Sequence, residues 1–501
     1  MTEGHPSVPP PPTPPYGPPV APPPGAYRYG PPVHPAAGPA APPPSAPKRS
    51  RRGLWIGLGA AGLVVVLLVV GSVFALSAYL DKHGGSDGAG PHDMVAYADI
   101  EGLLDEHTRA LRDRDEKAFV APFDPADRKL VTQQTNLFRN LTKLPLRESR
   151  FKEFISRDFT DSGSGVTFTM IVSFVHQFEG FDPKPVEELY AWTVARSAKD
   201  APLRVTGVAG GMPGHEGRDM TTYHPAPWDM WEEIHVERTP HTLVISDAAL
   251  RAEARRLAPV AERAAADDLA AWRSGGVSAE VPQGFVITLA KGRKELGSLY
   301  RTTRETPLES GVAIPVPPVG AIDGETVDAL DVATTRVVID VADEYHFTKG
   351  SADRQATLFR HELAHGITNV LSDLQPGVAG LDGHAQWVVE GFAEWLGHDR
   401  RPWISSERTD ESRPVFRQRG ELEQLPSNAQ WAKNSKGSYH YWLAHSAIGY
   451  LAERYGEAKV IRFVAAHYQG SGVSTAMRDE LGVSFDEFEK AWAAYVAKTV
   501  R

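Results

Sequence analysis

The sequence predicts an α+β protein with a disordered tail, one transmembrane helix, a small α+β domain and a larger α+β domain. Three observations lead to this fold class. Roughly half of the 41 prolines precede Lys48, no charged residue occurs from Gly53 to Leu80, and strand-like alternation gives way to long helical patterns after residue 235. About 420 residues follow the apolar run, which is enough for two or three domains with their own cores.

The composition excludes several kinds of chemistry. The chain has no cysteine, so a metal site must use His, Asp or Glu, and disulfides and thiolate catalysis are excluded. The formal net charge is −10. Residues 1–80 contribute +4, from five basic side chains against Glu3, which leaves −14 for residues 81–501. We therefore expect no nucleic-acid partner, because phosphate binding needs a basic face.

Residues 1–52 are predicted to be a disordered, proline-rich cytoplasmic tail. Segments such as PPPPTPPYGPPVAPPPG lack many backbone donors and cannot bury apolar surface. Two interpretations stay open. The tail is either a solvated low-complexity segment or a strip that docks in the aromatic-lined groove of a cytoplasmic partner, with Tyr16, Tyr27 and Tyr29 as contacts.

The apolar run at residues 53–80 predicts a transmembrane helix. Such a helix rises about 42 Å, more than the roughly 30 Å of a hydrocarbon slab, so it can span a bilayer with tilt. The alternatives are a buried core helix and a cleaved signal peptide, whose apolar stretch would be shorter. Four basic residues from Lys48 to Arg52 precede the run, and the positive-inside rule then keeps the N-terminus in the cytoplasm. The predicted localisation is a single-pass cell-membrane protein whose C-terminal domains lie outside the cytoplasm.

A glycine-rich linker, residues 81–93, is expected before the small α+β domain, residues 94–230. Ile100–Ala118 has the pattern of an amphipathic helix, and residues 165–180 alternate as a half-buried strand does. The segments ELYAWTVARS and LRVTGVAG predict further strands. This order resembles the α+β cone of nuclear transport factor-like domains. The domain is interpreted as a spacer or substrate-presenting module, with pure scaffolding as the alternative.

Alternating strands and long helices predict the second domain, residues 235–501. The expected strands are 241–246, 285–289 and 337–341. The expected helices are 247–272, 353–371, 386–397, 438–455, 457–468 and a last one that begins at residue 485.

The chemistry of the second domain centres on the sequence HELAH, residues 361–365. Histidines four residues apart stand on one face of a helix, so the imidazoles of His361 and His365 can reach one metal ion. Glu362 projects beside them, where it can act as general base toward a water on that ion. A bare HExxH motif also arises by chance, so the interpretation needs a third ligand.

Glu390 is the candidate third ligand. It lies in QWVVEGFAEWLG, residues 386–397, among apolar side chains, where an unpaired carboxylate is costly. Glu394 is four residues further on and shares the same helix face. It can therefore accept the outer N–H of a ligand histidine and fix its tautomer. An ordinary solvated helix face is the alternative for Glu394.

With these motifs the sequence resembles the gluzincin metallopeptidases, the peptidase MA-like group that includes thermolysin and the zinc aminopeptidases. The resemblance rests on HELAH, W-x-x-E-G-F-A-E-W and GSYHYWLAHSAIGYLAERYG, and it covers about residues 235–501. It implies a gluzincin-type α+β fold and a site for one Zn²⁺ with the ligands His361, His365 and Glu390, the general base Glu362 and the outer acid Glu394. The 24 residues between the second histidine and the third ligand form a longer connection than in thermolysin.

The resemblance also implies a tyrosine that stabilises the oxyanion. Tyr441, ten residues before Leu451, occupies the place where zinc aminopeptidases carry this tyrosine. Tyr439, His440 and His445 are rivals for the role, and a packed or exposed tyrosine is the alternative for Tyr441. The sequence leaves open which tyrosine faces the site.

These expectations combine into a membrane-anchored zinc metallopeptidase, held in the lipid bilayer by residues 53–80, that hydrolyses peptide bonds outside the cytoplasm. Its substrate would be a peptide or protein, and Glu362 would act as general base on zinc-bound water. No segment that grips a free amino group is recognisable, so the choice between endo- and exopeptidase stays open. The alternative, from a different class, is a noncatalytic binding module on a gluzincin scaffold.

Overall fold

The computed structural model describes residues 94–161, 165–211, 223–300, 309–321, 330–374, 384–419, 424–433 and 437–500. These ranges all belong to one compact unit. The predicted tail, the predicted transmembrane segment and the predicted linker, residues 1–52, 53–80 and 81–93, lie outside the described residues.

None of the helices in the described ranges is long and apolar enough to cross a bilayer. This finding corrects two predictions, the fold class with a membrane-spanning helix and the single-pass membrane localisation. Both had rested on the apolar run at residues 53–80, which is not among the described residues. The α+β class itself holds for the described ranges, which combine antiparallel strands with long helices.

The first layer is a four-stranded antiparallel sheet in the order β1-β2-β3-β4. Its strands are β1 (Leu146–Asp161), β2 (Val166–Phe178), β3 (Val186–Arg196) and β4 (Arg204–Gly210). The helices before it are α2 (Tyr97–Arg112), α3 (Glu116–Val120) and α4 (Arg128–Leu141). The helix expected over Ile100–Ala118 is divided in two, because Arg114 has a positive φ of 58° and Asp115 caps a new helix by accepting a hydrogen bond from Ala118 N–H.

The second layer is a five-stranded sheet in the order β5-β6-β7-β10-β8. Its strands are β5 (Ile234–Arg238), β6 (Thr242–Asp247), β7 (Phe285–Ala290), β8 (Gly311–Val316) and β10 (Thr334–Asp340). β6, β7 and β10 run parallel, and the edge strands β5 and β8 run antiparallel to their neighbours. The short strands β9 (Leu330–Asp331) and β11 (Asp373–Leu374) pair with each other.

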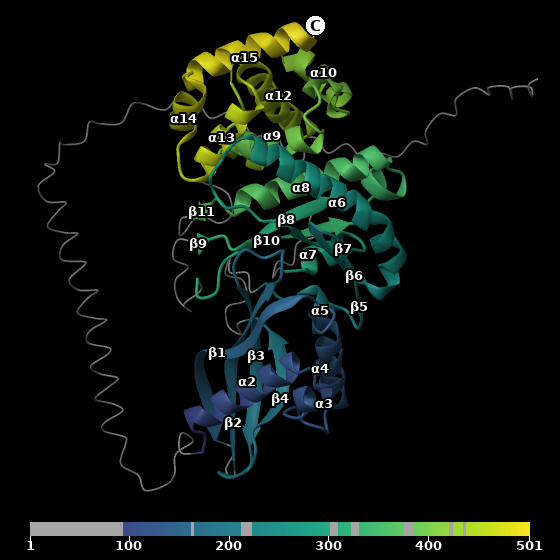
Figure 1. The fold of residues 1–501 in the computed structure, drawn as a ribbon, viewed down its shortest axis with the longest axis vertical. Helices are drawn as coiled ribbons and strands as arrows, with labels where there is room; N and C mark the ends of the chain where they lie inside the picture. Colours follow the sequence, from purple (N-terminus) through teal and green to yellow (C-terminus); the bar gives the residue numbers. More distant parts are fainter. Residues whose placement is uncertain are drawn as a thin grey trace, which may run out of the picture. The chain divides into compact units, whose positions relative to one another are not determined.

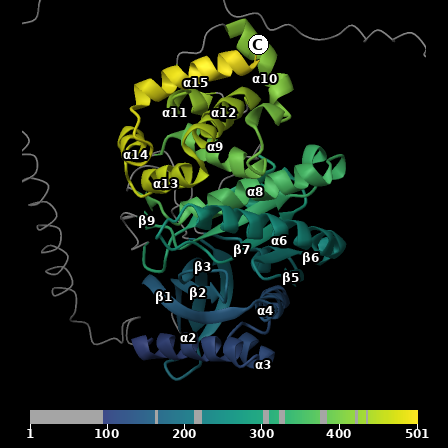
Figure 2. The same cartoon turned by 45° about the horizontal axis from the view of Figure 1, so that its top comes forward.

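The two faces of this sheet belong to two different cores. Val244, Ile287 and Val337 face the core formed with α6 (Arg251–Ser274) and α8 (Ala352–Asn369). The neighbouring residues in these strands face the opposite core, which the sheet shares with the first layer, α5 (Pro227–Met230) and α7 (Arg293–Ser298). These residues are Leu243, Ile245, Val286 and Val338. This alternation follows from the two-residue period of a strand. Figures 1 and 2 show α6 and α8 along one side of the sheet.

A group of helices follows and lies on α8. It comprises α9 (Gln386–Gly397), α10 (Arg408–Arg419), α11 (Asn428–Lys433), α12 (Ser438–Tyr455), α13 (Glu457–Tyr468), α14 (Val473–Ala476) and α15 (Phe485–Val500). Short helical turns are η2 (Ala248–Leu250), η3 (Glu344–Thr348), η4 (Trp403–Ser405) and η5 (Met477–Leu481). The predicted bounds of α9, α12 and α13 are confirmed.

Helix α9 is held closely between α8 and α12, and two glycines permit this approach (Figure 1). A Cβ atom on Gly391 would lie 2.5 Å from the carbonyl oxygen of Ala444 on α12. A Cβ atom on Gly397 would lie 3.2 Å from the carbonyl oxygen of Thr357 on α8. Glycine at position 391 therefore permits close packing on α12, and glycine at position 397 permits close packing on α8, which carries HELAH.

A buried ion pair joins the two layers. Asp182, just after β2, accepts hydrogen bonds from the guanidinium of Arg336 on β10 at 2.5 and 2.9 Å, and both side chains are 1% exposed or less. Phe178 N–H and the Thr334 hydroxyl also donate to this carboxylate. Burial raises the pKa of Asp182, but Arg336 and the hydrogen bonds outweigh burial and lower it below its usual value.

We expect Asp182→Asn to lower the free energy of unfolding by about 3–5 kcal/mol, because it leaves the Arg336 charge buried without a counter-charge. The stabilisation should be complete above a pH of about 4 and should fade as the pH falls further, since the native pKa lies below the unfolded one. Urea unfolding measures the change. Lys184→Ala, at an exposed ion pair with Asp331, is the control and should cost about 0–1 kcal/mol. Equal effects of the two substitutions would contradict this account.

A second prediction compares two glycines in helix interiors. Gly391→Ala should destabilise the fold by about 1–3 kcal/mol, because backbone atoms of α12 block its Cβ atom. Gly102→Ala on α2 meets nothing within 4 Å and should stabilise by about 0.5–1 kcal/mol through helix propensity. Stabilisation by both substitutions in urea unfolding would show that α9 and α12 are not in close contact.

Candidate metal centre

The HELAH segment lies in the second half of α8. The apolar residues of this helix pack it against the five-stranded sheet. Ser351 caps the helix by accepting a hydrogen bond from Arg354 N–H at 3.2 Å. Phe359, Leu363 and Ile367 are fully buried and form the apolar stripe that packs on the sheet and α6. The two histidines of the motif stand on the neighbouring face, toward α9.

Three side-chain atoms converge between α8 and α9. His361 Nε2 lies 3.2 Å from His365 Nε2, and Glu390 Oε2 lies 3.4 and 3.6 Å from these two nitrogens. All three side chains are less than a fifth exposed. The buried Glu390 Oε2 atom has no hydrogen-bond partner. The three residues predicted as ligands are thus brought together, and they could hold a metal ion.

The distances from Glu390 Oε2 to the two histidine nitrogens fit an ion better than they fit hydrogen bonds. An N–H···O hydrogen bond is usually about 2.9 Å long, whereas the carboxylate oxygen lies 3.4 and 3.6 Å from the two nitrogens. Donors at tetrahedral corners, each about 2.1 Å from a central ion, would be about 3.4 Å apart. The observed separations of 3.2, 3.4 and 3.6 Å lie close to this value. A cation would also satisfy the Glu390 oxygen that has no hydrogen-bond partner.

The electrostatics of the three residues also favour a cation. Burial lowers the pKa of His361, but the carboxylates of Glu390 and Glu394 outweigh it and raise this pKa to about 10. Burial raises the pKa of Glu390, but His365 and His361 outweigh it and lower this pKa to about 2. The carboxylates therefore stabilise positive charge at this place. A metal ion would replace the proton, because histidine binds metal only in its neutral form.

Glu362 is buried beside this cluster, at 6% exposure. Its carboxylate packs against strand β8, where a Cβ atom on Gly311 would lie 2.8 Å from Glu362 Oε1. Burial raises the pKa of Glu362 above its usual value, although His361 and His365 act in the opposite direction. A carboxylate whose pKa is raised is a stronger base than an exposed glutamate, which suits it to accept a proton.

Glu394 lies behind the histidine His361. Glu394 Oε1 lies 3.3 Å from His361 Nδ1, so the carboxylate can orient this ring and leave Nε2 to face Glu390. Arg408, at the start of α10, donates to both oxygens of Glu394 at 2.9 and 3.0 Å. Burial raises the pKa of Glu394, but Arg408 and His361 lower it well below its usual value. The outer acid is therefore ionised and fixed in place.

A second group, Glu394, His398 and His445, also has its ligand atoms within 4.8 Å of one another and could hold an ion. In this group Arg408 already neutralises the carboxylate. His398 is engaged as well, with Nδ1 2.9 Å from the backbone oxygen of Glu394 and Nε2 3.1 Å from Ser406 Oγ. The guanidinium would repel a metal ion there, so the first group is the stronger candidate.

Of the rival tyrosines, Tyr441 is the one beside the metal candidate. Its ring lies 6.3 Å from the ring of His361, and Arg408 lies over the Tyr441 ring at 4.8 Å. The Glu390 carboxylate and burial raise the pKa of Tyr441 well above its usual value, so the hydroxyl stays protonated. Tyr439 instead stacks on Trp442, with Arg419 over its ring.

The remaining rivals lie among other rings. His440 packs on Trp431, and the fully buried His445 packs on His398.

Sequence reasoning missed two residues of the site. Arg408 holds Glu394 from 14 positions further along the chain, and Gly311 on strand β8 lies against Glu362 on helix α8. An arginine in the polar segment SERTDES and a glycine at the start of a strand carry no local signal of such roles.

Comparison with protein-family models gives no match, and comparison with curated proteins gives none. The interpretation of the site therefore rests on its residues and their geometry.

We expect Arg408→Ala to weaken metal binding by about 10–100-fold, because Glu394 would lose its cation and hold His361 less firmly. Competition with a chelator measures the affinity. Arg401→Ala removes a nearby arginine that pairs with Asp353 on the surface and should leave the affinity unchanged. If the two variants bound metal equally well, Arg408 would have no role in stabilising the metal site.

Proposed function

We propose that the chain is a gluzincin-type zinc metallopeptidase that hydrolyses peptide bonds in a peptide or protein substrate. The observation that carries the proposal is the convergence of two imidazole nitrogens and one carboxylate oxygen at tetrahedral spacing, with Glu362 buried beside them. Three protein donors would leave one position for water or substrate, as in catalytic zinc sites and unlike closed structural ones.

Zinc is proposed because the donor set suits it. Two imidazoles and one carboxylate, with no cysteine in the chain, are a ligand combination found in catalytic zinc sites. When bound, zinc would polarise the substrate carbonyl and lower the pKa of water to about 7.

Glu362 would act as the general base. Its buried carboxylate takes a proton from the attacking water and passes it to the nitrogen of the leaving amine. The raised pKa of Glu362 suits this exchange, because a strongly acidic carboxylate would not hold the proton long enough to deliver it.

Tyr441 and Glu394 would support the reaction in different ways. The protonated Tyr441 hydroxyl can donate a hydrogen bond to the oxyanion that develops on the substrate. Glu394, fixed by Arg408, keeps His361 oriented so that Nε2 faces the ion site.

An edge strand favours a peptide over other carbonyl substrates. β8 lies at the edge of the five-stranded sheet, and in the described residues it pairs only with β10. Its first residue, Gly311, touches Glu362. An extended peptide that added to this edge would make main-chain hydrogen bonds and would pass beside the proposed general base.

The test is Glu362→Gln in the full chain loaded with zinc. We expect the variant to keep one zinc per chain and to lose cleavage of a peptide library by about 10²–10⁴-fold, because only the proton acceptor is removed. Glu344→Gln changes an exposed glutamate that pairs with Lys349 and should cleave at the rate of the unchanged protein.

Two outcomes would contradict the proposal. Undiminished cleavage by Glu362→Gln would remove this residue from the mechanism. Zinc binding without cleavage of any library peptide by the unchanged protein would favour the noncatalytic binding module.

A further inference from the structure

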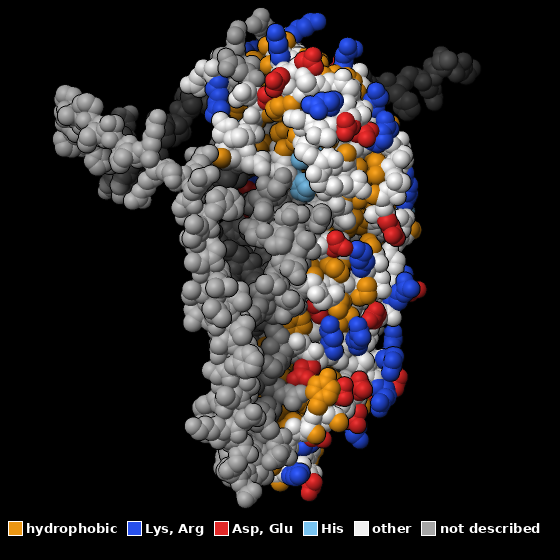
Figure 3. All heavy atoms as spheres, turned by 90° about the vertical axis from the view of Figure 1, so that its left-hand side faces the viewer, with side chains coloured by type: hydrophobic (Ala, Val, Ile, Leu, Met, Phe, Trp, Pro, Cys, Tyr) orange, Lys and Arg blue, Asp and Glu red, His pale blue; other side chains and the backbone are white. Residues whose placement is uncertain are grey.

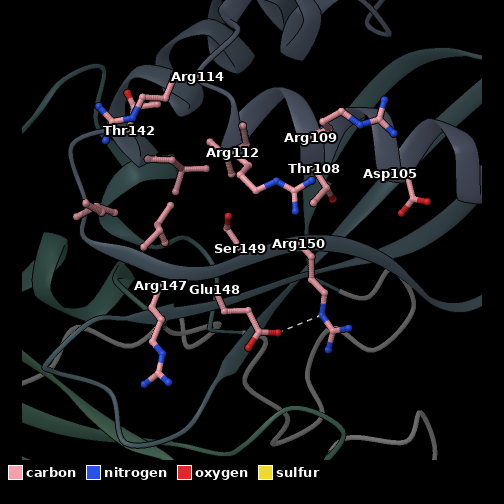
Figure 4. A pocket seen from close by; sticks show the side chains of 14 residues that line it. Asp105, Thr108, Arg109, Arg112, Arg114, Thr142, Arg147, Glu148, Ser149 and Arg150 are labelled. Atoms are coloured by element: carbon pink, nitrogen blue, oxygen red, sulfur yellow. Dashed lines mark ion pairs between the residues drawn. The ribbon is translucent and has the colours of Figure 1, made fainter.

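A separate cavity lies in the first layer, between α2 and the start of β1. Its volume is about 600 Å³, which is in the usual range for sites that bind small molecules. Three buried leucines, Leu111, Leu141 and Leu144, contribute an apolar lining. Polar side chains from the helix and from the strand surround this lining, as Figure 4 shows.

The polar lining is strongly basic. Five arginines contribute to it: Arg109, Arg112, Arg114, Arg147 and Arg150. Only Asp105 and Glu148 oppose them, so the formal charge of the lining is +3, from five positive and two negative groups. Residues 81–501 together carry −14. On the face shown in Figure 3, basic and acidic side chains of the described residues are interspersed.

Most of these arginines have no ion-pair partner among the described residues. Glu148 lies 3.4 Å from Arg150, and this pair is drawn in Figure 4. The other four arginines form no ion pair with a described residue. Like charges gathered around a cavity repel one another, and a multivalent anion would relieve this repulsion through charge-assisted hydrogen bonds.

Arg114 occupies a backbone position that does not favour arginine. It follows α2 with a φ of 58°, in the left-handed region where glycine or asparagine usually ends a helix. Termination of the helix therefore does not explain an arginine at this position. Its side chain lies at the edge of the cavity instead.

One helix face also offers a hydroxyl donor. Thr108 and Arg112 are four residues apart on α2, and both line the cavity (Figure 4). Thr108 Oγ1 accepts a hydrogen bond from Phe151 N–H at 2.8 Å, which leaves the hydroxyl proton free to donate.

We propose that this cavity binds a small soluble organic molecule that carries two or more phosphate or carboxylate groups. The arginines and Thr108 bind the anionic groups, and the leucines contact the carbon skeleton. This proposal is independent of the zinc site.

Isothermal titration of the full chain with pyrophosphate and with citrate at 0.15 M NaCl tests the proposal. We expect saturable 1:1 binding of at least one of these anions. The double variant Arg112→Ala, Arg147→Ala should weaken it about tenfold or more, because each arginine contributes charged hydrogen bonds. Arg128→Ala, an exposed arginine on α4 outside the cavity, is the matched control and should bind like the unchanged protein.

Arg114→Gly separates binding from folding. Glycine suits the left-handed conformation, so the melting temperature should rise while the anion affinity falls about threefold or more. A purely structural role of Arg114 would not weaken binding.

Three outcomes would overturn the proposal. The first is no saturable binding of either probe, and the second is equal affinity in all variants. The third is binding only to phosphatidylcholine vesicles that contain phosphatidylglycerol, which would assign the basic lining to a lipid surface instead.

Discussion

Two buried carboxylates on one short helix are the constraint on which the C-terminal half of the molecule depends. Glu390 and Glu394 lie among the tryptophans and aliphatic side chains of α9, where an uncompensated charge would cost several kcal/mol. Each carboxylate therefore needs a positive partner. Glu394 accepts a hydrogen bond from Arg408 and lies beside the ring of His361. Glu390 faces two imidazoles, and its Oε2 atom has no hydrogen-bond partner. These three side chains could hold a metal ion, which would also satisfy that oxygen.

The rest of the fold keeps these groups in position. The five-stranded sheet supports α8 on one face and the first layer on the other, and the buried Asp182–Arg336 pair fixes the two layers to each other. Gly397 lets α9 approach α8, which carries the histidines, and Gly391 lets α9 pack closely on α12. The candidate site thus results from helix packing. Glu394 orients His361, and Arg408 in turn fixes Glu394.

The sequence predicted the helical part of this arrangement well, because α9 and α13 are amphipathic and α12 is bounded by Gly437 and Gly456. Helix spacing could place His361 with His365, and Glu390 with Glu394, on shared helix faces. Joining the two pairs in one site rested on the apolar surroundings of Glu390 and on the resemblance to gluzincins. Arg408, Gly311 and strand β8 could not be recognised, since their roles depend on contacts between distant segments. The sequence also could not show which tyrosine faces the site. Tyr439 and Tyr441 lie two positions apart on α12, and the rotation of this helix about its axis decides which one lies beside His361. The predicted fold class with a membrane-spanning helix, in contrast, was wrong for the described residues, none of whose helices is long and apolar enough to cross a bilayer.

The most direct test of the central claim is a crystal structure of the zinc-loaded protein with anomalous diffraction recorded at the zinc absorption edge. The account predicts one strong anomalous peak within about 2.2 Å of His361 Nε2, His365 Nε2 and a carboxylate oxygen of Glu390. A peak only at another place, or a Glu390 side chain turned away from both histidines, would contradict it.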